Sequence, residues 1–321
     1  MTDQNLQGLR VLAVHAHPDD ESLWTGLALT HWARRGAEVT VVTCTLGEEG
    51  EVIGDKYQGL VAEHSGLLGG YRIAELQRAL AALGVNQDEV TGTARPRFLG
   101  GVAHWRDSGM AGTPPADHPR AFVRSGGAAV DALRAEIAGL RPHVVVTYGP
   151  DGGYGHPDHI RAHEITHAAV AAQADAGEWT PARIWWCVTE TEQLDAGLAE
   201  LRAAGGPPAD WRWPDDGELA SVPASSVDAR VTGSAEDLAA KQAAMVAHAT
   251  QLWVADGSVG DVIDTPRASA VGAPVPFCLS NLITQPLIGT ESFMLGERRD
   301  GEAGLSGETL NRLDCLFAEG R

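Results

Sequence analysis

Residues 9–22, LRVLAVHAHPDDES, decide the fold. An apolar run ends in a polar loop, and the next stretch, ESLWTGLALTHWARR, has a helical pattern that stops at Gly36 after two basic residues. The run EVTVVTCT from Glu38 is again apolar and β-branched. A strand, a crossover helix and a second strand predict parallel pairing. Because both strands are almost continuously apolar, we expect helices on both faces of their sheet.

The same alternation continues to about residue 190. The patterns predict helices over 71–83 and 126–140, a strand at 144–148, a helix ending near Ala174 and a further strand, ARIWWCV, from Ala182. We therefore expect an α/β fold with a Rossmann-like, mostly parallel sheet.

Beyond that point the texture changes to segments rich in Ala, Pro, Asp and Trp, such as GGPPADWRWPDDGE. One clear helix remains there, over 234–251, opened by Ser234 with Asp237 three residues on. We predict a catalytic core over residues 1–190 and a smaller C-terminal region, 191–321, that packs on it and helps to shape the pocket.

Composition excludes several classes of function. Among 321 residues, 43 acidic against 24 basic side chains give a formal net charge of −19, which argues against a nucleic-acid partner. The amino terminus lacks a signal-peptide pattern, and no apolar run approaches the roughly 20 residues of a membrane helix. The four cysteines form no CxxC pair, which is typical of reduced thiols. We expect a cytoplasmic protein without a membrane partner, and the oligomeric state stays open.

Two loops of similar make-up follow predicted strands. His17–Asp20 (HPDD) comes after the first strand, and His156–His159 (HPDH) comes after the strand at 144–148. In open parallel sheets, ligands bind outside the carboxyl ends of the strands, so we expect the two loops to converge there. A lone His-Pro-Asp is usually a turn, but two such loops at strand ends favour a metal site.

The residue types in these loops fit a catalytic zinc ion. Such an ion takes three protein ligands, here His17, Asp20 and His159, and keeps one position open for water. Asp19 would be free to take a proton from that water. Iron(II) accepts the same set of donors, so the identity of the metal stays open. The neighbouring Tyr154 and His156 could stabilise an oxyanion and, with His156 as an imidazolium, protonate a leaving group.

A second metal motif lies close by. His163, Glu164 and His167 spell HExxH, the helix signature of zinc metalloproteases. The sequence AAVAAQ that follows lacks the glycine and third histidine of one protease class, and no third ligand of the other class stands out. We interpret these histidines as solvated or core-edge groups, with a protease as the weaker alternative.

AHPDDES at 16–22 and GHPDH at 155–159 resemble the two signatures of the PIG-L/LmbE-type zinc-dependent N-acetylglucosamine deacetylases. Further stretches resemble the branch of this family that acts in mycothiol biosynthesis: CTLGEEGEVIGD at 44–55, LGGYRIAEL at 68–76, WRDSGMAG at 105–112, RPHVVVTY at 141–148, GGYGHPDH at 152–159 and AHATQ at 247–251. The resemblance is strong to about residue 170, returns at 247–251, and is faint elsewhere.

The resemblance implies a hydrolase that removes the N-acetyl group of N-acetylglucosaminyl-inositol. It implies the zinc ligands and base named above, electrophilic and oxyanion-stabilising roles for His156 and Tyr154, and an Asp158 that orients His156. It also places four residues against the sugar and inositol rings: Arg72, Asp107, Met110 and Glu51. A sister activity of the same family, cleavage of mycothiol S-conjugates, is the alternative. A non-catalytic sugar-binding module is the third, and the extra carboxylate Asp19 speaks against it.

Overall fold

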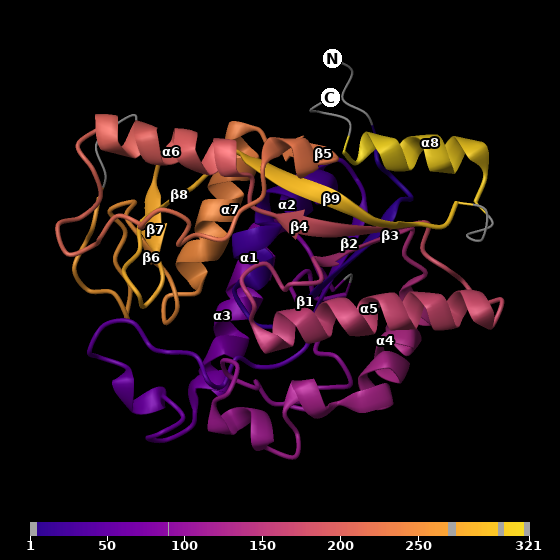
Figure 1. Ribbon diagram of the computed structural model, residues 1–321, viewed down its shortest axis with the longest axis horizontal. Coiled ribbons are helices and arrows are strands. Elements are labelled where there is room, and N and C mark those ends of the chain that lie inside the picture. Colours follow the sequence, from indigo (N-terminus) through magenta and orange to yellow (C-terminus); the bar gives the residue numbers. More distant parts are fainter. Residues whose placement is uncertain (1–4, 89, 269–273, 301–304, 318–321) are drawn as a thin grey trace.

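The computed structural model describes residues 5–88, 90–268, 274–300 and 305–317. Its centre is a six-stranded sheet in the order β2-β1-β3-β4-β9-β5 (Figure 1). The four parallel strands are β1 (Arg10–His15), β2 (Glu38–Thr43), β3 (Val144–Tyr148) and β4 (Arg183–Val188), and β9 (Thr290–Arg298) and β5 (Ala229–Thr232) continue the sheet in antiparallel pairing. The mostly parallel α/β fold is confirmed.

The parallel strands lie in the middle of the core. All five residues of β3 are buried, and in β1 only Arg10 is partly exposed. Val11 of β1 pairs with Val39 of β2 and Val144 of β3, so the three strands run in step. Their carboxyl ends therefore lie at one edge of the sheet, where the two polar loops begin.

Helices cover both faces of this sheet. On one face, α5 (Pro157–Asp175) packs against β1 and β3 and contacts α4 (Gly126–Leu140); Figure 1 shows these two helices together on one side of the strands. On the other, α2 (Gly26–Arg34) contacts α7 (Ala235–Ala247), which in turn contacts α3 (Leu68–Leu83).

The C-terminal part of the chain supplies further elements. They are α6 (Thr191–Ala203), a small antiparallel sheet of β6 (Trp253–Val254), β7 (Pro276–Cys278) and β8 (Gln285–Pro286), and α8 (Gly307–Cys315). Since β5 and β9 belong to the central sheet, this part is joined to the core by backbone pairing. The division near residue 190 stays a prediction.

The predicted helix over 21–35 is interrupted at Thr25, which separates α1 (Asp20–Trp24) from α2. Distant side chains satisfy the backbone groups freed by this break. The Lys241 ammonium donates to the Leu23 carbonyl at 3.0 Å, and the Glu291 carboxylate accepts the first amides of α2. Periodicity cannot indicate such a break, because its partners lie more than 200 residues away.

The predicted helix over 234–251 begins with the expected capping box of Ser234 and Asp237 but ends at Ala247. Residues 249–251 form a turn. His248, just before it, and Thr250, within it, contact carboxylates of other helices. Among the described residues, no helix combines the length and the apolar character that crossing a membrane requires.

Candidate active site

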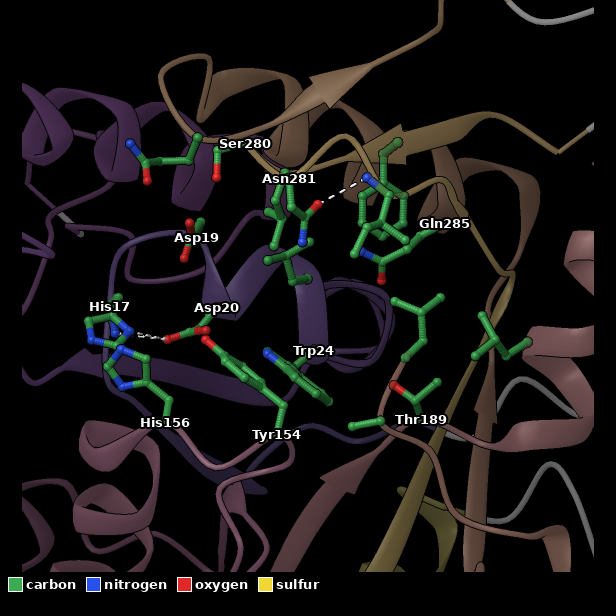
Figure 2. Close-up of a pocket in the computed structure, with 18 of the residues that line it drawn as sticks. His17, Asp19, Asp20, Trp24, Tyr154, His156, Thr189, Ser280, Asn281 and Gln285 are labelled. Carbon is green, nitrogen blue, oxygen red and sulfur yellow. Dashed lines mark hydrogen bonds and ion pairs between the residues drawn. The ribbon is translucent and has the colours of Figure 1, made fainter. Parts of the chain in front are cut away.

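The two polar loops meet at the carboxyl edge of the sheet. The first follows β1 and leads into α1, and the second follows β3 and forms the start of α5. Since β1 and β3 are hydrogen-bonded neighbours, residues about 140 positions apart face each other. Figure 2 shows His17 and Asp20 of one loop beside His156 and Tyr154 of the other, on the wall of a cavity.

Three donor groups converge at the centre of the site. The distance from His17 Nδ1 to Asp20 Oδ2 is 3.3 Å, from His159 Nε2 to Asp20 Oδ1 3.3 Å, and from His159 Nε2 to His17 Nδ1 3.3 Å. Two ligands held about 2.0–2.1 Å from a tetrahedral ion are about 3.3–3.4 Å apart. The two histidine nitrogens therefore have the spacing of two ligands of a tetrahedral ion, and each lies equally far from a different oxygen of the Asp20 carboxylate.

Each of these groups is held by further contacts. The ring nitrogen Nδ1 of His159 lies 3.0 Å from the Gly152 carbonyl, which leaves Nε2 free to bind an ion. Gly152 has φ of +67°, and a Cβ there would lie 2.8 Å from the His159 side chain, so glycine is needed for this approach. Asp20 Oδ2 accepts the Tyr148 hydroxyl at 2.7 Å and the His17 amide at 2.8 Å.

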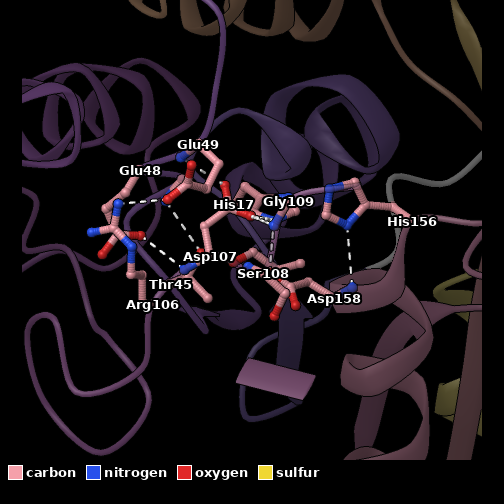
Figure 3. A network of polar contacts seen from close by, with 12 residues as sticks. His17, Thr45, Glu48, Glu49, Arg106, Asp107, Ser108, Gly109, His156 and Asp158 are labelled. Atoms are coloured by element: carbon pink, nitrogen blue, oxygen red, sulfur yellow. Dashed lines mark hydrogen bonds and ion pairs between the residues drawn. The ribbon is translucent and has the colours of Figure 1, made fainter. Parts of the chain in front are cut away.

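The other nitrogen of His17 faces two more carboxylates. Its Nε2 lies 3.3 Å from Asp158 Oδ2 and 3.6 Å from Asp107 Oδ1 (Figure 3). With Asp20, three buried carboxylates surround one imidazole, and this excess of negative charge favours a bound cation. Among the described residues, two groups bring one donor atom per residue within 4.8 Å of one another: His17 with His156 and His159, and His17 with Asp107 and Asp158. Asp20 belongs to neither group.

Asp19 lies beside this centre in an unusual conformation. Its backbone has φ of 119°, which is rare for a residue other than glycine. Its carboxylate lies 3.0 Å from the Arg72 guanidinium, and Arg72 also donates to the Pro18 carbonyl. Burial, partly opposed by Arg72, raises the pKa of Asp19 to about 6. A carboxylate with such a pKa is suited to take a proton near neutrality.

His156 and Tyr154 line the opposite wall of the site. The His156 ring lies 4.6 Å from that of His17, and its Nδ1 accepts the Asp158 amide at 3.2 Å. Burial, together with the neighbouring histidines, lowers the pKa of His156 to about 3, so the ring is neutral at rest. The expected imidazolium is thus not the resting form. Tyr154 is half-exposed, with its ring 5.1 Å from that of His159.

Asp158 contacts His156 differently from the expectation. Its carboxylate accepts the Ser108 amide at 2.9 Å and faces His17, and only its backbone amide reaches the His156 ring. The reason is local: Asp158 lies in the first turn of α5, where the free backbone amides point towards the preceding His156.

The residues expected to hold substrate surround a cavity of about 560 Å³ that includes the central site. Arg72 and Asp107 are buried in its wall, whereas Met110 is half-exposed and Glu51 is exposed. Asp107 also accepts the Glu49 and Gly109 amides (Figure 3), so it ties together two loops of the cavity wall.

The chain is similar to known proteins over most of its length. Residues 12–170 match PIG-L, described as GlcNAc-PI de-N-acetylase. A 1D-myo-inositol 2-acetamido-2-deoxy-alpha-D-glucopyranoside deacetylase from Corynebacterium jeikeium is 53% identical over 90% of this chain and 91% of its own. The chain belongs to the PIG-L family.

A second curated relative agrees with this membership. A deacetylase of the same name from Corynebacterium urealyticum is 54% identical over 89% of this chain and 84% of its own. Among solved structures, the N,N'-diacetylchitobiose deacetylase from Pyrococcus horikoshii is 20% identical over 55% of this chain and 59% of that one, with a TM-score of 0.40. The family expected from the two HPD loops is confirmed.

Tyr148 is a residue of this PIG-L site that the sequence analysis did not select. Its ring stacks on His159 at 4.1 Å and 13°, and its hydroxyl contacts Asp20 and the Ala16 amide. The available signal was its position, since it is the one aromatic residue of the VVVTY strand and directly precedes the second loop.

The two histidines of the HExxH motif in this PIG-L chain, His163 and His167, make contacts away from the central site. His163 Nδ1 contacts the Tyr148 carbonyl at 3.0 Å, and His167 lies between Glu297 and the Trp186 indole, each at 3.0 Å. Neither histidine belongs to a group of metal-binding geometry in the described part of the chain. Their contacts fit the interpretation as core-edge groups.

Proposed function

We propose that this chain is a zinc-dependent hydrolase that converts N-acetylglucosaminyl-inositol into glucosaminyl-inositol and acetate in mycothiol biosynthesis. The observation that carries the proposal is that one nitrogen of His17 and one of His159 lie 3.3 Å from each other and 3.3 Å from the Asp20 carboxylate, with the Asp19 carboxylate outside that set. The names of the curated relatives supply the substrate class.

The ligand set proposed for the ion is His17, Asp20 and His159. Zinc bound there would supply Lewis acidity, which makes an amide carbonyl more electrophilic and lowers the pKa of water. The buried contacts to Tyr148 and Gly152 would hold Asp20 and His159 in place before the ion binds.

Asp19 is proposed as the general base. It takes a proton from the attacking water as the water oxygen bonds to the acetyl carbon. When the bond between that carbon and nitrogen breaks, Asp19 returns the proton to the departing amine, so the carboxylate is regenerated. The pKa of about 6 suits both transfers near neutrality.

His156 and Tyr154 are proposed to stabilise the negative oxygen of the tetrahedral state. Because Nδ1 of His156 accepts the Asp158 amide, the neutral ring carries its proton on Nε2 and is a hydrogen-bond donor there. The Tyr154 hydroxyl is a second donor. Although the residue as a whole is half-exposed, desolvation of the hydroxyl and the nearby Asp20 raise its pKa, so it stays protonated. The Asp158 amide fixes the His156 ring, and the Asp158 carboxylate contacts the other nitrogen of the proposed ligand His17.

Arg72, Asp107, Met110 and Glu51 are proposed to bind the sugar and inositol rings at the wall and rim of the cavity. Hydrogen bonds to hydroxyl groups would exclude analogues that leave these polar groups unpaired.

The test is release of free amine by the metal-loaded protein from N-acetylglucosaminyl-inositol and, in parallel, from a mycothiol S-conjugate. Faster turnover of the acetylated sugar supports the deacetylase, whereas preference for the conjugate moves the assignment to the amidase. Amine from neither would overturn the proposed substrates. The variant Asp19→Asn is the control: near-normal turnover with metal still bound would contradict the role of Asp19 as the base.

The identity of the metal needs its own experiment. The protein stripped with a chelator should lose turnover and regain it with zinc, and iron(II) added without oxygen is the comparison. Recovery with iron alone would contradict the zinc assignment. We also propose a cytoplasmic location, which fractionation of native cells would test.

A further inference from the structure

The segment AHATQ at 247–251 contacts the residues that follow the first polar loop, His17–Asp20, although it is more than 220 residues away in sequence. Nε2 of His248 lies 2.7 Å from Glu21 Oε1, and both side chains are fully buried. Two residues on, the Thr250 amide and hydroxyl both donate to Glu75 of α3, at 2.8 and 2.7 Å. This turn therefore joins α7 to α1 and α3.

Glu21 connects His248 to Asp19. One carboxylate oxygen, Oε1, accepts His248 and the Ser22 hydroxyl, and the other, Oε2, accepts the Asp19 amide at 3.0 Å. The Nδ1 atom of His248 has no hydrogen-bond partner among the described residues. The hydrogen bond from Nε2 to Glu21 is therefore the one that orients the His248 ring.

The backbone of Asp19 requires such support. With φ of 119° and ψ of −30°, it lies outside the regions that residues with a side chain prefer. Backbone strain of this kind persists only where the surroundings fix the conformation. Arg72 holds the carboxylate of Asp19 and the carbonyl before it, and Glu21 holds its amide, so the residue is fixed from two sides.

We propose that His248 and Glu21 are positioning residues that hold Asp19 in the conformation needed for proton transfer. This inference rests on the proposed function, in which Asp19 is the base. His248 donates to Glu21, which keeps the buried carboxylate directed at the Asp19 amide. Without this donor, the carboxylate would be left short of a partner and would turn, and the Asp19 backbone would relax towards negative φ.

The experiment compares His248→Leu, which removes the donor, with His248→Gln, which keeps an N–H donor. We expect kcat of the leucine variant to fall about 100-fold, the cost of a small misplacement of a reacting group. KM and the dissociation constant for zinc should stay close to those of the parent protein, because no ligand or substrate-binding residue is changed. The glutamine variant should recover most of kcat.

A matched control exists on the neighbouring helices. His31 of α2 pairs with Asp237 of α7 at 2.9 Å, a partly buried histidine–carboxylate contact that does not reach the cavity. His31→Leu should leave kcat within about twofold, as expected for a change away from the reacting groups. An equal fall in kcat for both leucine variants would show a general loss of structure and would overturn the inference.

Other results would also contradict the positioning role. If folded His248→Leu keeps parental kcat, or if its zinc affinity falls in step with kcat, the positioning role is wrong. A crystal structure of this variant gives a direct readout, and an unchanged Asp19 φ with the Glu21 contact intact would also contradict it. Asp19→Asn is measured alongside: if that variant turns over normally, the proposed base fails, whereas its inactivity beside an active His248→Leu refutes only the positioning role.

Discussion

The first turn of α5, with His159, differs in its contacts from the next two turns, with His163 and His167. His159, His163 and His167 are spaced four residues apart, so they lie on one face of the helix. His159 meets His17 and Asp20, whereas His163 and His167 bind a backbone carbonyl, a glutamate and an indole. The same residue type on the same face therefore has different surroundings.

Helix rise explains the difference. Each step of four residues moves about 6 Å along the axis. α5 starts at the carboxyl edge of the sheet and then passes along β3, so only its first turn reaches the opposing loop. Position relative to the strand ends, and not the motif, decides which histidine can meet a ligand set.

The largest loss of turnover and zinc affinity is expected from a substitution in the first turn of α5. His159→Ala should abolish turnover and weaken zinc binding by more than the roughly 10–100-fold typical of changes outside the ligand set. His163→Ala, four residues on, should keep both. Metal titration by competition and amine release would measure them, and the reverse pattern would restore the protease interpretation.

A smaller loss of turnover is expected from a substitution of His156, which precedes the first residue of α5. His156→Phe keeps the ring volume but removes the proposed donor to the oxyanion, so kcat should fall by about 100–1,000-fold. Zinc affinity should change little if His156 is not a ligand. A large loss of affinity in the same titration would instead support the alternative group of His17, His156 and His159.

Tyr148 touches both halves of the comparison, since its hydroxyl contacts Asp20 and its carbonyl contacts His163. Tyr148→Phe keeps the stacking on His159 and removes only the hydroxyl, so zinc affinity should fall by about tenfold. The dissociation constant, measured against a chelator, checks this. Unchanged affinity would show that the Asp20 carboxylate is held well enough by the His17 amide alone.

The smallest effect concerns the pH dependence of stability. Burial lowers the pKa of His163, so the folded protein binds a proton less readily there than the unfolded chain does, and stability should fall as pH drops below about 6.5. His163→Gln cannot titrate, and the shift of its urea midpoint between pH 7.5 and pH 5.5 should be smaller. An equal shift in both proteins would mean that His163 contributes nothing to the pH dependence.

The sequence by itself determined the parallel core and the place of the site. Continuous apolar strands separated by helical patterns specify a sheet covered on both faces. Polar loops that follow parallel strands all lie at the carboxyl edge of that sheet. His17, Asp20 and His159 could therefore be brought together without coordinates. The family resemblance added the residues of the cavity wall, such as Arg72 and Asp107, which periodicity alone would not have selected.

Only the tertiary structure decided the contacts that depend on distant partners. The break at Thr25, the pairing of β9 with β4, the contact of His248 with Glu21, and the turn of Asp158 towards His17 each join segments remote in sequence. Local patterns carry no information on such pairs, because their geometry follows from how helices pack on the sheet. The spacing of donor atoms and the strained backbone of Asp19 likewise depend on contacts between segments remote in sequence.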